Sequence, residues 1–145
     1  MAKRKDDKTL DLFSVPVPSN IPGTLNLNIE IPALISAAIK DSRMDRDEIA
    51  FQMSRLTGDH ITDDMLNAWT AQSKTQWRFP LQYLPAFEIA VGSHIVSHHV
   101  AEKCGGTFLI GEDVLQARLG KRLAQKKQLE DEIRSLQKRI GGANS

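Results

Sequence analysis

Apolar residues recur at helical spacing in two short stretches, and this pattern predicts helices over Arg46–Leu56 and Thr62–Gln72. A turn at 57–59, with Gly58 at its centre, separates them. The residues expected to face inward are Ile49, Ala50, Met53, Leu56, Met65, Leu66 and Trp69. Two helices joined by a short, glycine-containing turn are typical of the helix-turn-helix, whose second helix enters the DNA major groove.

Polar residues at the ends of these helices support the same boundaries. Asp45 is the expected N-cap of the first helix, with Glu48 as its capping-box partner. Thr62 is the expected N-cap of the second helix, and Asp63 and Asp64 follow in its first turn, where carboxylates favour the positive end of the helix dipole.

Further apolar segments on either side predict the rest of a helical domain. Pro32 is placed to open a helix over Ala33–Lys40, and helices are expected at Leu81–Val91 and Ser93–Lys103. Gly105-Gly106 should end the last of these, before an apolar extended segment at Thr107–Ile110. The inward residues expected here are Leu81, Leu84, Phe87, Ile89, Val91, Ile95, Val96 and Val100.

The C-terminal part predicts one long polar helix over residues 112–140. Its apolar residues Leu129, Ile133, Leu136 and Ile140 have the 4-3-4 spacing of a coiled-coil seam. A second stripe, Leu115, Leu119 and Leu123, lies upstream, but Arg122 and Lys126 interrupt the seam between the two. We expect an oligomerisation helix. The alternative is a solvated or DNA-grazing helix, because Arg118, Lys121, Arg122, Lys126 and Lys127 make it locally basic.

These elements predict an all-α fold in which a lambda-repressor-like helix-turn-helix domain precedes a coiled-coil helix. The expected organisation is a flexible, proline-rich N-terminal arm at 1–32, the DNA-binding domain at 33–110, the oligomerisation helix at 111–141 and a disordered tail at 142–145.

Composition and charge restrict the possible functions. A single cysteine excludes an internal disulfide and fits a reducing cytoplasm, and no long apolar run or signal-like N-terminus predicts a membrane or secreted protein. The net charge of +1 divides into 0 for residues 1–32, −2 for 33–110 and +3 for 111–145. DNA-binding domains are usually basic, so the acidic middle region argues against simple, strong DNA binding.

Several residues of the second motif helix and the loop after it are candidates for DNA contact. They are Thr62, Asn67, Thr70, Ala71, Gln72, Lys74 and Arg78. Asn and Gln side chains can pair with adenine, Thr and Ala can contact a thymine methyl, and Lys74 and Arg78 could hold phosphates. The alternative is a plain helical core in which Trp77 and Phe79 only close the edge of the domain.

Metal binding and catalysis are not expected. His94 and His98 have a spacing that can present two imidazoles to zinc, with His99 and Cys104 nearby. However, the sequence has no HExxH glutamate and no CxxC pair, so we expect surface or interface histidines and no metal or other cofactor. No phosphate-binding glycine loop or nucleophile motif occurs either, and an enzyme is not expected.

Ordered segments of the chain resemble known phage proteins. Asp47–Gly58 and Ile61–Trp69, followed by Arg78-Phe79-Pro80 and Tyr83–Phe87, resemble small helix-turn-helix proteins of Mu-like transposable phages and their prophage relatives. The stretch from Val91 to Phe108 is similar to the end of phage regulatory CII-type proteins, in which a helix closes in a Gly-Gly turn.

The resemblance covers about residues 44–110 and implies a phage-encoded transcription regulator or accessory factor. Such a protein would bind double-stranded DNA as a dimer or higher oligomer in the bacterial host cytoplasm. Two alternatives stay open. One is an oligomeric assembly or DNA-packaging adaptor of the small-terminase kind, and the other is a protein partner of a phage transposition or replication factor.

Overall fold

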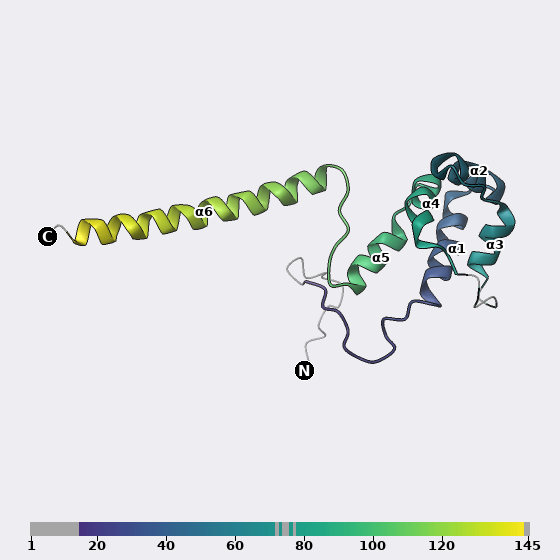
Figure 1. The fold of residues 1–145 in the computed structure, drawn as a ribbon, viewed down its shortest axis with the longest axis horizontal. Helices are drawn as coiled ribbons and strands as arrows, with labels where there is room; N and C mark the ends of the chain where they lie inside the picture. Colours follow the sequence, from purple (N-terminus) through teal and green to yellow (C-terminus); the bar gives the residue numbers. More distant parts are fainter. Residues whose placement is uncertain (1–14, 72, 74–75, 77, 144–145) are drawn as a thin grey trace, which may run out of the picture. The chain divides into compact units, whose positions relative to one another are not determined.

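The computed structural model describes residues 15–71, 73, 76 and 78–143 (Figure 1). This part of the chain contains six α-helices, one 3₁₀ helix and no strand, which confirms the predicted all-α class. The chain separates into two compact units, residues 1–108 and residues 109–145. The helices are α1 (Glu30–Ser42), α2 (Arg46–Thr57), α3 (Asp63–Thr70), η1 (Leu81–Tyr83), α4 (Leu84–Val91), α5 (Ile95–Lys103) and α6 (Glu112–Gly142).

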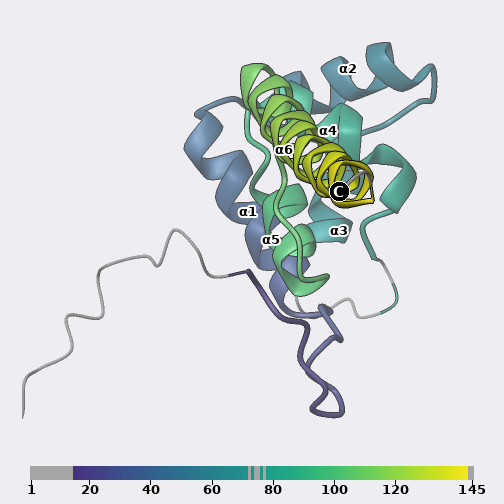
Figure 2. The ribbon, with the colours of Figure 1, turned by 90° about the vertical axis from the view of Figure 1, so that its left-hand side faces the viewer.

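The first unit is built around one core to which α1 to α5 all contribute (Figures 1 and 2). Helix α2 packs against α3 and α4, and α1 contacts α3, α4 and α5. The largest fully buried side chains are Ile35, Ile49, Met53, Leu66, Phe87 and Val96. Five of these six come from segments whose helical spacing placed them inward, so the pattern of apolar residues located most of the core.

Four residues that were expected to face the core are exposed instead. Leu81 and Ile89 are 77% and 62% exposed. Leu81 lies in the 3₁₀ helix η1, before α4 begins at Leu84, so the α-helical period does not apply to it. Ile89 lies two residues after the buried Phe87, a rotation of about 200° around α4 that places it on the opposite face. Leu56, at the end of α2, and Ile95, at the start of α5, are also exposed rather than inward.

Other expected boundaries also need correction. Helix α1 begins at Glu30, before Pro32, and α5 begins at Ile95 rather than Ser93 because α4 ends at Gly92 with a bond from its N–H to the Glu88 carbonyl. The apolar segment at 107–110 pairs with no other segment and is not a strand.

The ends of the motif helices are formed in different ways. The Thr62 hydroxyl accepts a hydrogen bond from Met65 N at 3.2 Å, which confirms the predicted cap of α3. The predicted capping box of α2 is wrong: Asp45 occupies the N-cap position without a side-chain bond. Glu48 instead accepts a hydrogen bond from Gln52 Nε2 one turn later, at 2.9 Å, and is therefore turned away from the start of the helix.

The segment before α1 packs against the end of α5. Gly105, with φ +81°, follows the last turn of α5. A Cβ atom at this position would lie 2.7 Å from Pro18 Cδ and 3.0 Å from the Pro16 carbonyl oxygen. The N-terminal proline segment, residues 16–18, therefore approaches the backbone more closely than any side chain would allow.

Helix α6 forms the second unit and buries none of its residues. The predicted seam residues Leu129, Ile133, Leu136 and Ile140 are 47–66% exposed, as are the upstream leucines to a similar degree. No helix in the described part of the chain combines the length and the apolar character needed to cross a bilayer.

Candidate nucleic-acid interface

The connection between α2 and α3 is held by side-chain hydrogen bonds. Gly58, with φ +77°, donates its N–H to the Ser54 carbonyl and ends α2. The Ser54 hydroxyl accepts from Ile61 N at 2.9 Å and lies 2.8 Å from the Ala50 carbonyl oxygen, to which it can donate. The start of α3 is thereby tied to the last turns of α2.

A second link joins this turn to η1. The Tyr83 hydroxyl donates to Asp59 Oδ2 at 2.8 Å. Donation to a carboxylate, together with some loss of hydration, raises the pKa of the Tyr83 phenol above its ordinary value of 10.0.

Aromatic side chains fix α3 from its inner side. The ring of the buried Trp69 lies 5.3 Å from Phe79 in an edge-to-face arrangement and 5.8 Å from Tyr83. Phe79 in turn packs edge-to-face on Phe87 at 5.5 Å. Phe79 is thus part of the support of α3, as the core-only alternative expected, whereas Trp77 lies outside the described residues.

The predicted DNA-contacting residues in and next to α3 differ in their exposure and in the hydrogen bonds that their side chains make. Asn67 is exposed, and its side chain makes no hydrogen bond within the described residues. Thr62 is half-buried and engaged as the N-cap. The Thr70 hydroxyl lies 2.9 Å from the Leu66 carbonyl oxygen, to which it donates, and it accepts from Arg46 Nη1 at 3.3 Å. Of the predicted residues on α3, Asn67 is therefore the one whose side chain is exposed and makes no hydrogen bond within the described residues.

The predicted helix over Thr62–Gln72 is too long, because α3 ends at Thr70. Ala71 follows with extended backbone, so it does not continue the outer face of α3. Arg78 is exposed in the loop before η1. Gln72 and Lys74 lie outside the described residues.

The charge of α3 is acidic at its N-terminal end. Asp63 and Asp64 occupy the first turn, and the helix has no basic residue. The helix dipole stabilises carboxylates there, but the same carboxylates repel phosphate. Of the two cations predicted to hold phosphates, Lys74 and Arg78, neither belongs to α3, and Arg78 is the one that the structure describes.

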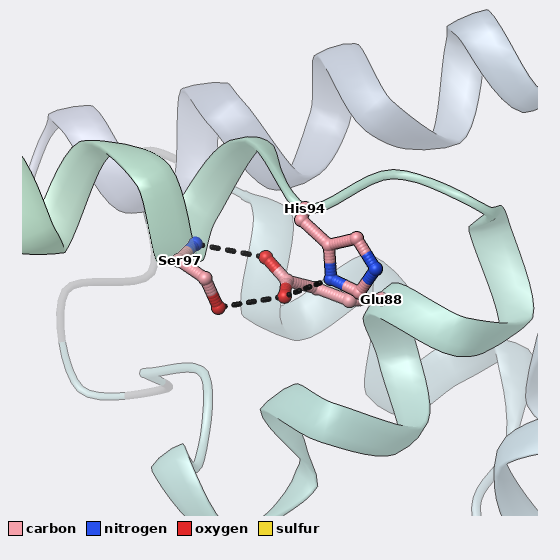
Figure 3. Close-up of polar contacts among 3 residues, drawn as sticks. All are labelled: Glu88, His94 and Ser97. Atoms are coloured by element: carbon pink, nitrogen blue, oxygen red, sulfur yellow. Dashed lines mark hydrogen bonds and ion pairs between the residues drawn. The ribbon is translucent and has the colours of Figure 1, made fainter. Parts of the chain in front are cut away.

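A buried carboxylate joins α4 to α5 (Figure 3). Glu88 is only 2% exposed. Its Oε1 accepts from Ser97 N at 2.8 Å, and its Oε2 accepts from the Ser97 hydroxyl at 2.6 Å and lies 3.0 Å from His94 Nδ1. Ser97 N is one of the unpaired donors in the first turn of α5, so Glu88 caps that helix from the helix before it.

The sequence analysis did not single out Glu88. Its signal was a lone carboxylate in the apolar run Leu84–Val91, followed after six and nine residues by a histidine and a serine. A charged residue on the inner side of an apolar helix is rarely buried without hydrogen-bond partners, and this could have pointed to it.

The histidines have separate surroundings. His94 and His98 each place their ring against Phe108, at 5.3 and 5.2 Å. His99 Nε2 lies 3.4 Å from Glu30 Oε2, and Lys103 Nζ lies 3.5 Å from the other oxygen of that carboxylate. The polar contact with His99 lowers the pKa of Glu30 most. Partial desolvation of the carboxylate raises this pKa, and the positive charge of Lys103 lowers it further. Within the described residues no group of three His, Cys, Asp or Glu side chains is arranged to hold a metal ion.

No protein-family model, no curated protein and no solved structure matches this chain.

Proposed function

We propose that the chain is a DNA-binding protein that acts as a dimer or higher oligomer, with α2 and α3 as its helix-turn-helix. The supporting observation is the division of α3 into two sides. Leu66 and Trp69 are buried and fix the helix in the core, while Asn67 is exposed with its amide unpaired. A short helix held rigidly from behind, with a free amide in front, suits direct contact with base edges.

In this proposal, Asn67 pairs with an adenine in the major groove. Arg78 holds a phosphate beside the groove, and Lys74 is expected to do the same. The resemblance of residues 44–110 to phage regulators makes transcription regulation in a bacterial host the proposed biological setting.

The proposed oligomer forms through the seam of α6, since four large apolar side chains on one side of this helix are exposed. A symmetric pair doubles the few phosphate contacts that one acidic domain can make.

Fluorescence anisotropy on duplexes enriched from a random pool tests the docking of α3. Asn67→Ala should reduce the preference for the selected sequence by about fivefold or more, since one bidentate base contact contributes ~1–3 kcal/mol. Arg78→Ala should weaken binding to all sequences and lower the salt slope by about 1. Gln82→Ala, an exposed change in η1, is the control. An unchanged preference in Asn67→Ala would exclude this docking.

A second function is favoured by the acidic first turn of α3, namely an oligomeric assembly or DNA-packaging adaptor. In that case the seam of α6 would join many copies, and α3 would serve as scaffold. Light scattering distinguishes the two, because a dimer agrees with a regulator and a ring of many copies agrees with an adaptor.

A further inference from the structure

We propose that α6 is a second DNA-binding element, in which two copies pair through the seam and their basic segments separate to hold the phosphates of one duplex. The basic segment is defined as residues 118–127, and the seam as Leu129, Ile133, Leu136 and Ile140. The inference rests on the proposed function for its ligand, double-stranded DNA, but it assigns that ligand to a different helix.

The seam has the residue types of a parallel, two-stranded pair. Its 4-3-4 spacing assigns Leu129 and Leu136 to d positions and Ile133 and Ile140 to a positions of a heptad. Among parallel coiled coils, isoleucine at a with leucine at d favours two strands. All four side chains are at least 47% exposed. The occupant that matches them is the same seam of a second copy.

Continuing this heptad upstream shows where the pairing stops. Lys126 falls at an a position and Arg122 at a d position. In a parallel pair, each would face the same positive charge on the other copy. Leu115 and Leu119 again occupy d and a positions, but the charged positions of Arg122 and Lys126 separate them from the seam. In this proposal the favourable pairing is therefore confined to the part from Leu129 onward, and the two helices diverge before it.

The diverging part carries a high density of exposed positive charge. Its cations are Arg118, Lys121, Arg122, Lys126 and Lys127, and residues 114–129 contain no acidic residue. All five are exposed. Of these five cations, Lys126 forms an ion pair with Glu130 one turn on, at 3.7 Å, and Arg122 Nη1 donates to Gln125 Oε1 at 3.1 Å; both contacts are exposed. An exposed pair of this kind contributes little, so all five charges are available to a ligand.

The geometry of the basic segment matches a duplex better than a membrane surface. At 1.5 Å per residue the segment is about 14 Å long, a length over which B-DNA presents roughly eight phosphate charges. An interfacial membrane helix needs a continuous apolar face. Arg122 and Lys126 lie within the stripe formed by the upstream leucines, so no such face exists. A continuous helix with a basic segment before a dimer seam can fork across the major groove.

The test compares two charge-matched variants of the full-length protein on a generic 30-base-pair duplex, by anisotropy between 50 and 200 mM salt. The basic variant carries Arg118→Gln, Lys121→Gln and Arg122→Gln. The control variant carries Arg134→Gln, Lys138→Gln and Arg139→Gln, which removes the same charge beyond the start of the seam. Glutamine keeps helix propensity, and circular dichroism checks that both variants retain the wild-type helix content.

The basic variant should bind at least tenfold more weakly at 50 mM salt, and its log–log salt slope should be shallower by about 5 if six phosphate contacts per dimer are lost. The control variant should stay within about twofold of the wild type. Equal losses in both variants, or no loss in the basic variant, would overturn the proposal. So would wild-type binding to vesicles containing phosphatidylserine without binding to DNA.

The same titration separates this proposal from the one for α3. If Asn67→Ala lowers the preference for the selected duplex and Arg78→Ala lowers binding to the generic one, while the basic variant binds as the wild type does, the helix-turn-helix proposal is supported and the role of α6 is excluded. If only the basic variant loses binding, α6 is the DNA-binding element and α3 is scaffold. Leu136→Glu, which places a charge in the seam, should yield a monomer by light scattering and about half the salt slope. A dimer that persists in this variant would contradict the pairing.

Discussion

Removal of the Glu88 carboxylate should destabilise the first unit more than any comparable change at an exposed glutamate. In Glu88→Ala, the Ser97 N–H and hydroxyl lose their acceptor in a buried site, and α5 loses its cap. An unsatisfied buried donor costs ~1–3 kcal/mol and a lost helix cap about 1 kcal/mol. These contributions overlap because they concern the same amide, so we expect a total of about 3 kcal/mol, including the lost packing.

Glu88→Gln tests the importance of the charge separately from the shape. The amide oxygen can still accept from Ser97 N, but the amide nitrogen now faces the Ser97 hydroxyl and His94 Nδ1, which must both become acceptors. Hydrogen bonds to a charged group are about twice as strong as neutral ones, so we expect a loss of about 1 kcal/mol.

Urea unfolding followed by tryptophan fluorescence measures both variants, since Trp69 lies in the core of this unit. The control is Glu48→Ala, which loses only an exposed hydrogen bond to Gln52 and should cost at most ~0.5 kcal/mol. If Glu88→Ala costs no more than Glu48→Ala, the carboxylate does not cap α5 in solution and the argument is refuted.

Three further changes test separate contacts. Gly105→Ala and Gly58→Ala both place a side chain at positive φ, which costs ~1–2 kcal/mol each. Only the Cβ atom of Gly105→Ala meets the N-terminal proline segment. Its loss of free energy of unfolding, measured in urea, should therefore exceed that of Gly58→Ala by about 1 kcal/mol or more. Equal losses would show that the segment does not pack there. Thr62→Ala should cost about 1 kcal/mol in the same assay, and no change would deny the cap. The chain has one tyrosine, so the absorbance of phenolate in a pH titration should give a midpoint above 10.0 for Tyr83. In Asp59→Asn this midpoint should return toward 10.0. An unshifted midpoint in the wild type would contradict the hydrogen bond between Tyr83 and Asp59.

The sequence predicted those features that depend on local spacing and on single residues. The start of α2, the ending of α2 at Gly58 and the Thr62 cap follow from neighbours within one turn of helix. The position of Ile49 and Leu66 in the core follows from the helical period.

Features that depend on distant contacts were not predictable in this way. Helix α3 stops at Thr70, where the hydroxyl is bonded both within the helix and to Arg46 of α2, and no spacing rule indicates this. Glu48 has two possible partners at similar distance along the chain, and it is bonded to Gln52 rather than to the start of α2. The partners of Glu88 lie on the next helix, so its burial depends on how α4 and α5 pack.

The shortness of α3 has a consequence for how variants of this protein will behave. Eight residues are too few for a stable helix in isolation, so α3 exists only while Trp69 and Leu66 are held by the rest of the unit. The amide protons that are hydrogen-bonded within α3, from Leu66 onward, should therefore exchange with solvent only when the whole unit opens, with the same free energy of opening as those of the core of α2. A core substitution that leaves a cavity far from Asn67 would then unfold α3 with the rest of the unit, and the Asn67 amide would lose its position without any change at Asn67 itself. Hydrogen exchange is thus the measurement that separates a lost ligand contact from a lost helix.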